Sequence, residues 1–113
     1  MTDLKTKIEE LKASQKERAG QLIDYRVDAW DVTLKIKKAT LSDQEKSGKF
    51  AKRHFRHLET EKGNMASGAA LICIVCAEGL ELTKENVQFL LDEPAEAIMD
   101  IIREINQLAG INV

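Results

Sequence analysis

Residues 63–110, GNMASGAALICIVCAEGLELTKENVQFLLDEPAEAIMDIIREINQLAG, decide the fold that we expect for this chain. Met65 to Ala77 is apolar around nearly its whole circumference when placed on a helix, as a central helix buried on several sides would be. An acidic turn, Glu78-Gly79-Leu80-Glu81, follows it. Thr83 then suits the N-cap of a short helix, and Pro94 suits the first turn of a last, amphipathic helix. The stretch therefore predicts a core of three consecutive helices.

The last helix has a clear division between an apolar and a polar face. Gly110 suits the left-handed position after its end. The apolar face carries Ile98, Ile101, Ile102, Ile105, Leu108 and Ala109, and the polar face carries Glu96, Asp100, Arg103, Glu104 and Gln107. This pattern predicts that one face packs on the core.

Residues 42 to 58 predict one more helix upstream. Ser42 and Glu45 have the spacing of a capping box, which should start the helix. Its apolar arc holds Phe50, Ala51, His54, Phe55 and Leu58, and its opposite arc holds Lys46, Lys49, Lys52, Arg53 and Arg56. We expect Gly63-Asn64 to separate this helix from the apolar one.

Residues 22 to 38 predict a β-hairpin. Val32, Leu34 and Ile36 alternate with polar residues, the period-two pattern of a half-buried strand. Leu22 to Val27 can pair with this strand across Asp28-Ala29-Trp30-Asp31. A lone hairpin is marginal in water, so a helix should cover its apolar face.

Residues 3 to 19 predict an N-terminal helix that Gly20 ends. Leu4, Ile8 and Leu11 lie one helical turn apart and form a narrow apolar seam. Such a short seam cannot stabilise an isolated helix, so it must lean on something. We predict that these three residues mediate self-association, giving a homo-oligomer.

Length and composition set the class of protein. At 113 residues with 43% hydrophobic and 32% charged residues, the chain fits one globular domain, 1–113. We expect a mainly α fold with one small β-hairpin: a helix over 1–20, the hairpin over 22–38 and a compact, bundle-like helical core over 42–110. The start of the chain does not read as a signal peptide, and no apolar run is long enough to span a membrane. These features predict a cytoplasmic protein without membrane contact.

The order of elements in the C-terminal half resembles that of tail assembly chaperones from long-tailed, siphovirus-type phages. The pattern in that family is an apolar helix, an acidic-Gly turn, a capped helix ending in Leu-Leu, and a last helix rich in Ala, Ile and Leu. The matching residues here are Glu78, Gly79, Thr83, Glu85, Val87, Leu90, Leu91, Ala95, Ile98, Ile101, Ile102 and Ile105. Trp30-Asp-Val-Thr-Leu-Lys-Ile is similar to a family segment that precedes the first long helix. Residues 3 to 19 have no counterpart in the pattern.

The resemblance implies a function and partners. Tail assembly chaperones bind the tape measure protein and the tail tube protein in the host cytoplasm during tail morphogenesis, and they are absent from the finished virion. In relatives, ribosomal frameshifting near the end of the gene adds a second domain. The gene of such a chaperone should lie between those of the tube protein and the tape measure protein.

Candidate sites for chemistry are few. Cys73 and Cys76, with His54 and His57, have ligand spacings that could bind zinc. Both cysteines lie in an apolar helix without the turn that folds thiolates around a metal, so we expect buried, reduced, metal-free thiols. No nucleophile, base and orienting group occur in a convincing arrangement, and no Gly-rich loop is present. We therefore expect neither an enzyme nor a cofactor.

Charged residues are distributed unevenly along the chain. Residues 32 to 58 carry eight Lys or Arg against two acids, and residues 77 to 104 carry eight acids against two bases. This polarity can attract one subunit to another or can simply solvate two surfaces.

The basic helix 46–56 could contact nucleic acid, although it lacks interleaved aromatic residues and the chain is acidic overall. Two alternatives to a chaperone therefore stay open: a small nucleic-acid-binding regulator that uses helix 46–56, and a structural oligomeric subunit of an assembly.

Two aromatic residues stand outside the regular apolar patterns. Trp30 lies in the predicted turn, and Phe89 falls on the polar side of its helix. Large aromatic residues outside a core stripe are typical anchors of protein interfaces. We predict that Trp30 and Phe89 bind the partner; the alternative is that each covers an edge of a small core.

Overall fold

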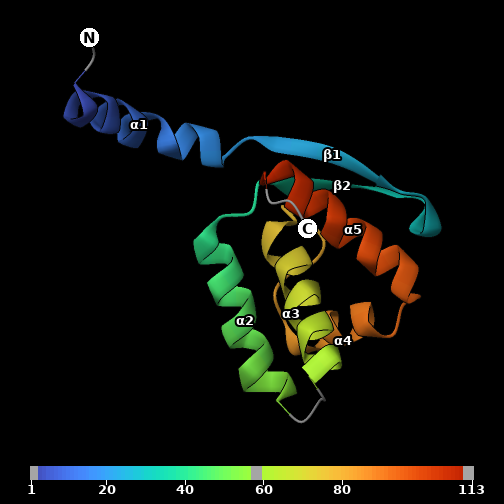
Figure 1. The fold of residues 1–113 in the computed structure, drawn as a ribbon. Helices are drawn as coiled ribbons and strands as arrows, with labels where there is room; N and C mark the ends of the chain where they lie inside the picture. The colour runs from blue at the N-terminus through green and yellow to red at the C-terminus, as the bar shows by residue number, and fades with distance from the viewer. Residues whose placement is uncertain (1–2, 57–59, 111–113) are drawn as a thin grey trace.

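The computed structural model describes residues 3–56 and 60–110, and the side chains of these residues except at 18–19 and 60–64. The elements in chain order are α1 (Leu4–Ala19), β1 (Leu22–Val27), the 3-10 turn η1 (Asp28–Trp30), β2 (Val32–Lys37), α2 (Leu41–Phe55), α3 (Thr60–Val75), α4 (Lys84–Leu91) and α5 (Ala95–Leu108). The chain is mostly helical with one two-stranded antiparallel sheet, as Figure 1 shows. The predicted fold class is thus confirmed.

Helix α3 is the centre of the core. It packs along α2 and also contacts α4 and α5. Seven of its ten residues from Ala66 to Val75 are buried, and Ala66, Ala69, Ala70 and Ile72 are fully so. Alanine and glycine at these positions let neighbouring helices approach closely. Among the described glycines, Gly68 is the one at which an added Cβ would lie 2.5 Å from Ile102 Cδ1 of α5.

The hairpin lies across one end of the helical body (Figure 1). Its strands pair with Tyr25 opposite Leu34 and Ile23 opposite Ile36, so these four residues share one face. Leu34 and Ile36 are buried in the core on that face. The second edge of β2 also has a partner, because the Ala77 amide donates to the Lys35 carbonyl at 2.8 Å.

The start of α2 differs from the predicted capping box. Thr40, not Ser42, is the N-cap: its hydroxyl accepts from the Asp43 amide at 3.1 Å, and the Asp43 carboxylate accepts from the Thr40 amide at 3.0 Å. Asp43 also pairs with Lys37 of β2 at 3.5 Å. A capping box can form with Thr40 and Asp43 or with Ser42 and Glu45. The ion pair between Asp43 and Lys37 favours the helix start at Thr40.

The boundary between α2 and α3 was also predicted wrongly. Gly63 and Asn64 do not break the chain but lie within α3, which begins at Thr60. A glycine or an asparagine inside a helix lowers helix stability by less than about 1 kcal/mol relative to alanine. Packing of α3 against α2 outweighs this cost. At its other end α3 stops at Val75, two residues before the predicted end, because Cys76 forms a bridge with Ile36.

The predicted ends of α4 and α5 are close to those observed. Thr83 is the N-cap of α4 and accepts from the Asn86 amide at 3.1 Å. Pro94 is the residue just before α5, and Gly110 after it has φ of +79°. Gly79 in the acidic turn has φ of +88°, which only glycine adopts without strain.

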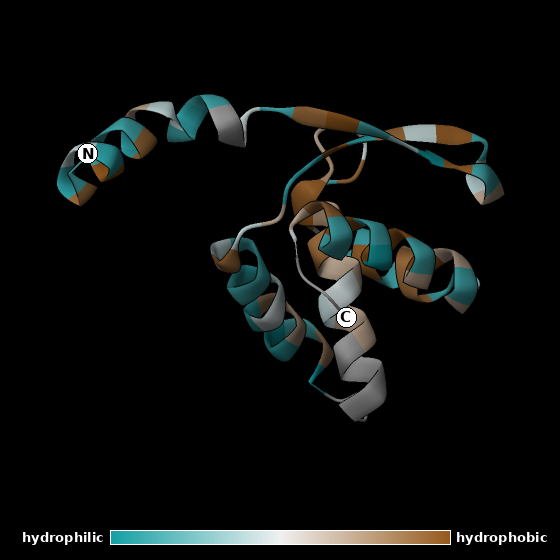
Figure 2. Cartoon of the chain, turned by 45° about the horizontal axis from the view of Figure 1, so that its top comes forward, coloured by the Kyte–Doolittle hydropathy of each residue, from teal (hydrophilic) through white to brown (hydrophobic). Residues whose placement is uncertain are grey.

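Helix α1 extends away from the body at the end where the hairpin lies (Figures 1 and 2). The molecule is accordingly elongated, with principal extents of 52 × 31 × 24 Å. Within the described residues, no helix is both long and apolar enough to cross a membrane.

Candidate partner-binding site

Trp30 and Phe89 lie next to each other, although 59 positions separate them in the sequence. Their ring centroids are 6.0 Å apart and the rings are tilted by 42°. This distance and tilt are typical of a favourable aromatic pair. Trp30 is half-buried against the core, whereas Phe89 is 48% exposed. The structure thus joins the two predicted contact residues into one aromatic pair at the surface.

Local turns position both rings. The 3-10 turn η1 carries Trp30 at the tip of the hairpin, and Asp31 closes the turn with φ of +53°. Arg26 of β1 pairs with Asp31 and with Asp28, which ties the turn to the strand before it. The Asn86 side chain donates to the Glu81 carbonyl at 2.8 Å and so fixes the start of the helix that carries Phe89.

The indole of Trp30 is not fully satisfied. Its Nε1 is buried, and no hydrogen-bond acceptor for it occurs among the described residues. A buried donor without an acceptor costs about 1 to 3 kcal/mol. An aromatic side chain without an N–H donor at this position would avoid this cost.

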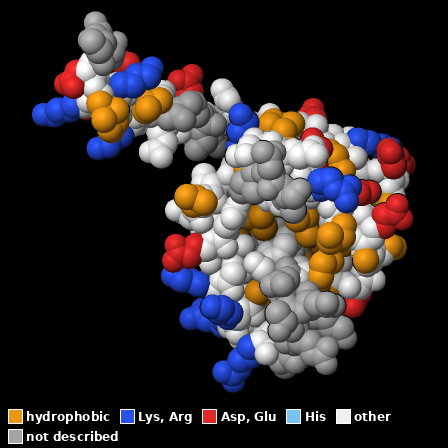
Figure 3. Space-filling view, in the orientation of Figure 1, with side chains coloured by type: hydrophobic (Ala, Val, Ile, Leu, Met, Phe, Trp, Pro, Cys, Tyr) orange, Lys and Arg blue, Asp and Glu red, His pale blue; other side chains and the backbone are white. Residues whose placement is uncertain are grey.

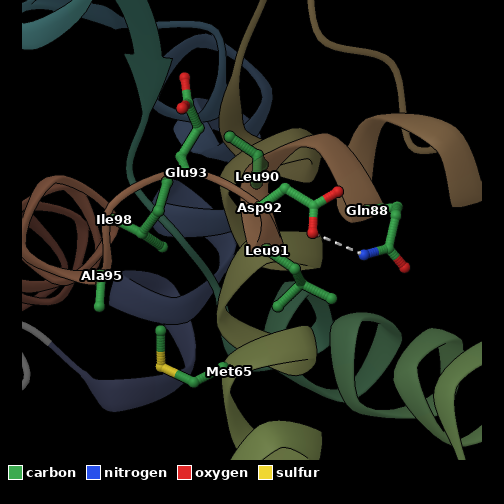
Figure 4. A pocket seen from close by; sticks show the side chains of 8 residues that line it. All are labelled: Met65, Gln88, Leu90, Leu91, Asp92, Glu93, Ala95 and Ile98. Atoms are coloured by element: carbon green, nitrogen blue, oxygen red, sulfur yellow. Dashed lines mark hydrogen bonds between the residues drawn. The ribbon is translucent and has the colours of Figure 1, made fainter.

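A second feature, not predicted from the sequence, is an apolar cavity of about 390 Å³ beside α4. We call it the α4 pocket; its lining residues are Met65, Gln88, Leu90, Leu91, Asp92, Glu93, Ala95 and Ile98. Figure 4 shows Leu91 and Met65 on opposing sides of it, and Asp92 bonded to Gln88 at 3.1 Å near its edge. The pocket forms where three helix ends meet, so no periodic pattern in the sequence marks it.

The predicted seam of α1 is exposed. Leu4 is 72% exposed, Ile8 41% and Leu11 42%. Figure 2 shows α1 as a mostly hydrophilic helix with isolated hydrophobic segments. The residues predicted to mediate self-association are therefore available to a partner.

The two cysteines are packed against the helical core. Cys73 is buried in α3 and Cys76 is half-buried after it. Burial, with a smaller contribution from Cys76, raises the pKa of the Cys73 thiol to about 11, and burial also raises the pKa of Cys76. His54 stacks on Phe50 at 4.5 Å between ring centroids. The described residues contain no cluster of three metal-ligand side chains; His57 and Leu58 lie outside them.

The cations of α2 form one exposed face. The exposed residues are Lys46, Lys49, Lys52, Arg53 and Arg56, and Lys49 pairs with Glu45 at 3.0 Å. Figure 3 shows blue side chains along the edge of the molecule where α2 lies. Phe50 is half-buried against the core and stacks on His54, so it offers no free ring for a base.

Comparison of the chain with protein-family models, with curated proteins and with solved structures found no match.

Proposed function

We propose that this protein is a tail assembly chaperone of a long-tailed phage, which binds the tape measure protein, the tail tube protein or both during tail morphogenesis. The observation that carries the proposal is the Trp30–Phe89 pair, because two large aromatic residues outside the apolar stripes lie side by side at the surface. The residues that resemble the family pattern support it. Gly79 occupies a left-handed turn, Thr83 caps α4, and Val87 and Leu90 face the core.

The proposed mechanism is temporary covering of apolar surface. About half of Phe89 is exposed to solvent, and the Trp30 ring packs against the Phe89 ring. A client segment that covers Phe89 would exclude water from the pair and leave the core unchanged. Because the client must later polymerise, the complex should be displaceable, with an affinity well below that of a permanent interface.

Co-expression with the tape measure and tube proteins of the same genome tests this function. We expect the chain to co-purify with at least one of them and to increase its soluble fraction, because apolar client surface is covered. Failure to bind either protein in both co-expression and mixing experiments would contradict the proposal.

The two alternatives give different results in separate assays. A nucleic-acid-binding regulator would be retained on duplex DNA at low salt and released at high salt through the α2 cations. A structural subunit would be found in purified particles. A chaperone should show neither behaviour.

A further inference from the structure

The seam of α1 has basic flanks. In a seven-residue repeat, Leu4 and Leu11 occupy d and Ile8 occupies a. The e positions are Lys5 and Lys12, and the g positions are Lys7 and Ser14. All three lysines are exposed, and Lys7 lies 3.9 Å from the Glu10 carboxylate. The acids of α1 are Glu9 at a b position and Glu10 and Glu17 at c positions, on the side away from the seam.

These flanks disfavour pairing of α1 with another α1. In a parallel two-helix coiled coil, a g residue of one helix faces an e residue of the other, so Lys7 would face Lys12. An antiparallel pair would likewise oppose lysine to lysine. The seam is better suited to an apolar groove that has acids at its edge.

The α4 pocket provides such a groove. Leu91, Ala95 and Ile98 contribute apolar lining, and Asp92 and Glu93 are the charged residues among the lining residues. None of its lining residues is a base. The volume of about 390 Å³ is sufficient for one or two anchoring side chains of an amphipathic helix.

The positions of the two surfaces exclude docking within one molecule. Figure 1 shows α1 leaving the body at the open end of the hairpin, whereas α4 and the start of α5 lie on the side of the hairpin tip, where Trp30 contacts Phe89. Only Gly20 and Gln21 connect α1 to β1, and two residues span at most about 7 Å. A seam on such a short connection does not reach its own pocket.

We propose that the α1 seam of one copy docks into the α4 pocket of a second copy, with lysines of the seam next to Asp92 and Glu93. The contact is heterologous, so each copy offers one seam and one pocket. Such a contact continues until a ring closes or a filament grows. Self-association should therefore increase with protein concentration and weaken with added salt.

A mixing experiment with two variants tests the contact. Ile8→Ser removes the central seam residue, and Ala95→Arg places a cation at the edge of the pocket on an exposed position. Leu41→Ser and Ala77→Arg are matched controls at exposed positions outside both surfaces. Each variant is first checked for an unchanged circular dichroism spectrum, and association is then measured by sedimentation velocity.

We expect the unmodified chain and both controls to form higher oligomers as concentration rises. Each variant alone should be monomeric, with a dissociation constant raised about ten-fold or more. An equimolar mixture should give one 1:1 heterodimer, because Ala95→Arg keeps its seam and Ile8→Ser keeps its pocket. A monomeric unmodified chain, oligomers of Ala95→Arg alone, or a mixture without heterodimer would each overturn the proposal.

Discussion

Cys73 is a buried thiol whose reactivity is determined by its packing in α3. Because burial raises its pKa to about 11, almost none of it is thiolate at neutral pH. We expect Cys73 to react with a thiol reagent at pH 7 only after unfolding in denaturant. Rapid labelling of both cysteines in the folded protein would show that α3 is not packed as described.

The same pKa predicts a pH dependence of stability. In the unfolded chain the thiol ionises near pH 9, whereas in the folded protein it stays protonated up to about pH 11. The unfolded state therefore gains from ionisation first, and the free energy of unfolding should fall as pH rises from 9 through 11. Denaturant titrations of the unmodified chain and of Cys73→Ala should show a smaller fall in the variant. An equal decrease in the free energy of unfolding in both proteins would show that other groups cause the pH dependence.

Single residues illustrate what sequence patterns predict well. The exposure of Phe89 followed from its position opposite the apolar stripe of its helix. Leu4, Ile8 and Leu11 form an apolar seam that was expected to pack on something, and in the structure all three are exposed. The contact between Trp30 and Phe89 did not follow, because it depends on how the hairpin tip lies against α4. Periodicity describes each element alone and contains no information about such pairs.

At the scale of elements, the observed cap of α2 gives a direct comparison. Thr40→Ala removes the hydroxyl that accepts from Asp43, so we expect a loss of about 1 kcal/mol of stability. Ser42→Ala at the predicted but unused position should change stability by less than about 0.5 kcal/mol. Urea unfolding of both variants measures this. A larger loss for Ser42→Ala than for Thr40→Ala would favour the later helix start.

Two helical glycines give a second comparison. Gly48 in α2 has open space around it, so Gly48→Ala should stabilise by about 0.5 to 1 kcal/mol through helix propensity. Gly68→Ala gains the same propensity but has to displace Ile102 Cδ1, and it should stabilise less or not at all. Denaturant unfolding distinguishes them. An equal gain at both sites would contradict close packing of α3 and α5.

The errors of sequence interpretation at this scale concern the boundaries of helices. Gly63 and Asn64 resemble a helix end in isolation, yet α3 continues through them to Thr60. The predicted capping box began at Ser42, whereas the observed N-cap of α2 is Thr40, whose partner Asp43 also pairs with Lys37. In both cases tertiary contacts outweigh differences of about 1 kcal/mol in local preference.

At the scale of the whole molecule, the sequence predicted the set of elements but not their arrangement. The α4 pocket is formed by α3, the end of α4 and the start of α5, and the separate positions of pocket and α1 depend on how these helices cross. The opposite charges of the two segments were visible in the sequence. Of these two segments, only the acidic one takes part in the proposed contact, through Asp92 and Glu93; the lysines of the contact lie on α1, outside residues 32–58.

The central claim is that the Trp30–Phe89 pair binds a client, and one comparison of variants tests it most directly. Phe89→Ala removes the exposed ring, and Met99→Ala removes an apolar side chain of similar exposure, 44%, on α5. Affinity for the tape measure or tube protein is measured by titration calorimetry, and each variant is also melted.

We expect Phe89→Ala to weaken client binding about ten-fold or more while its free energy of unfolding changes by no more than about 1.5 kcal/mol. Met99→Ala should bind like the unmodified chain. Undiminished binding by a stably folded Phe89→Ala variant would contradict the claim, and a collapsed melt would show that Phe89 belongs to the core instead.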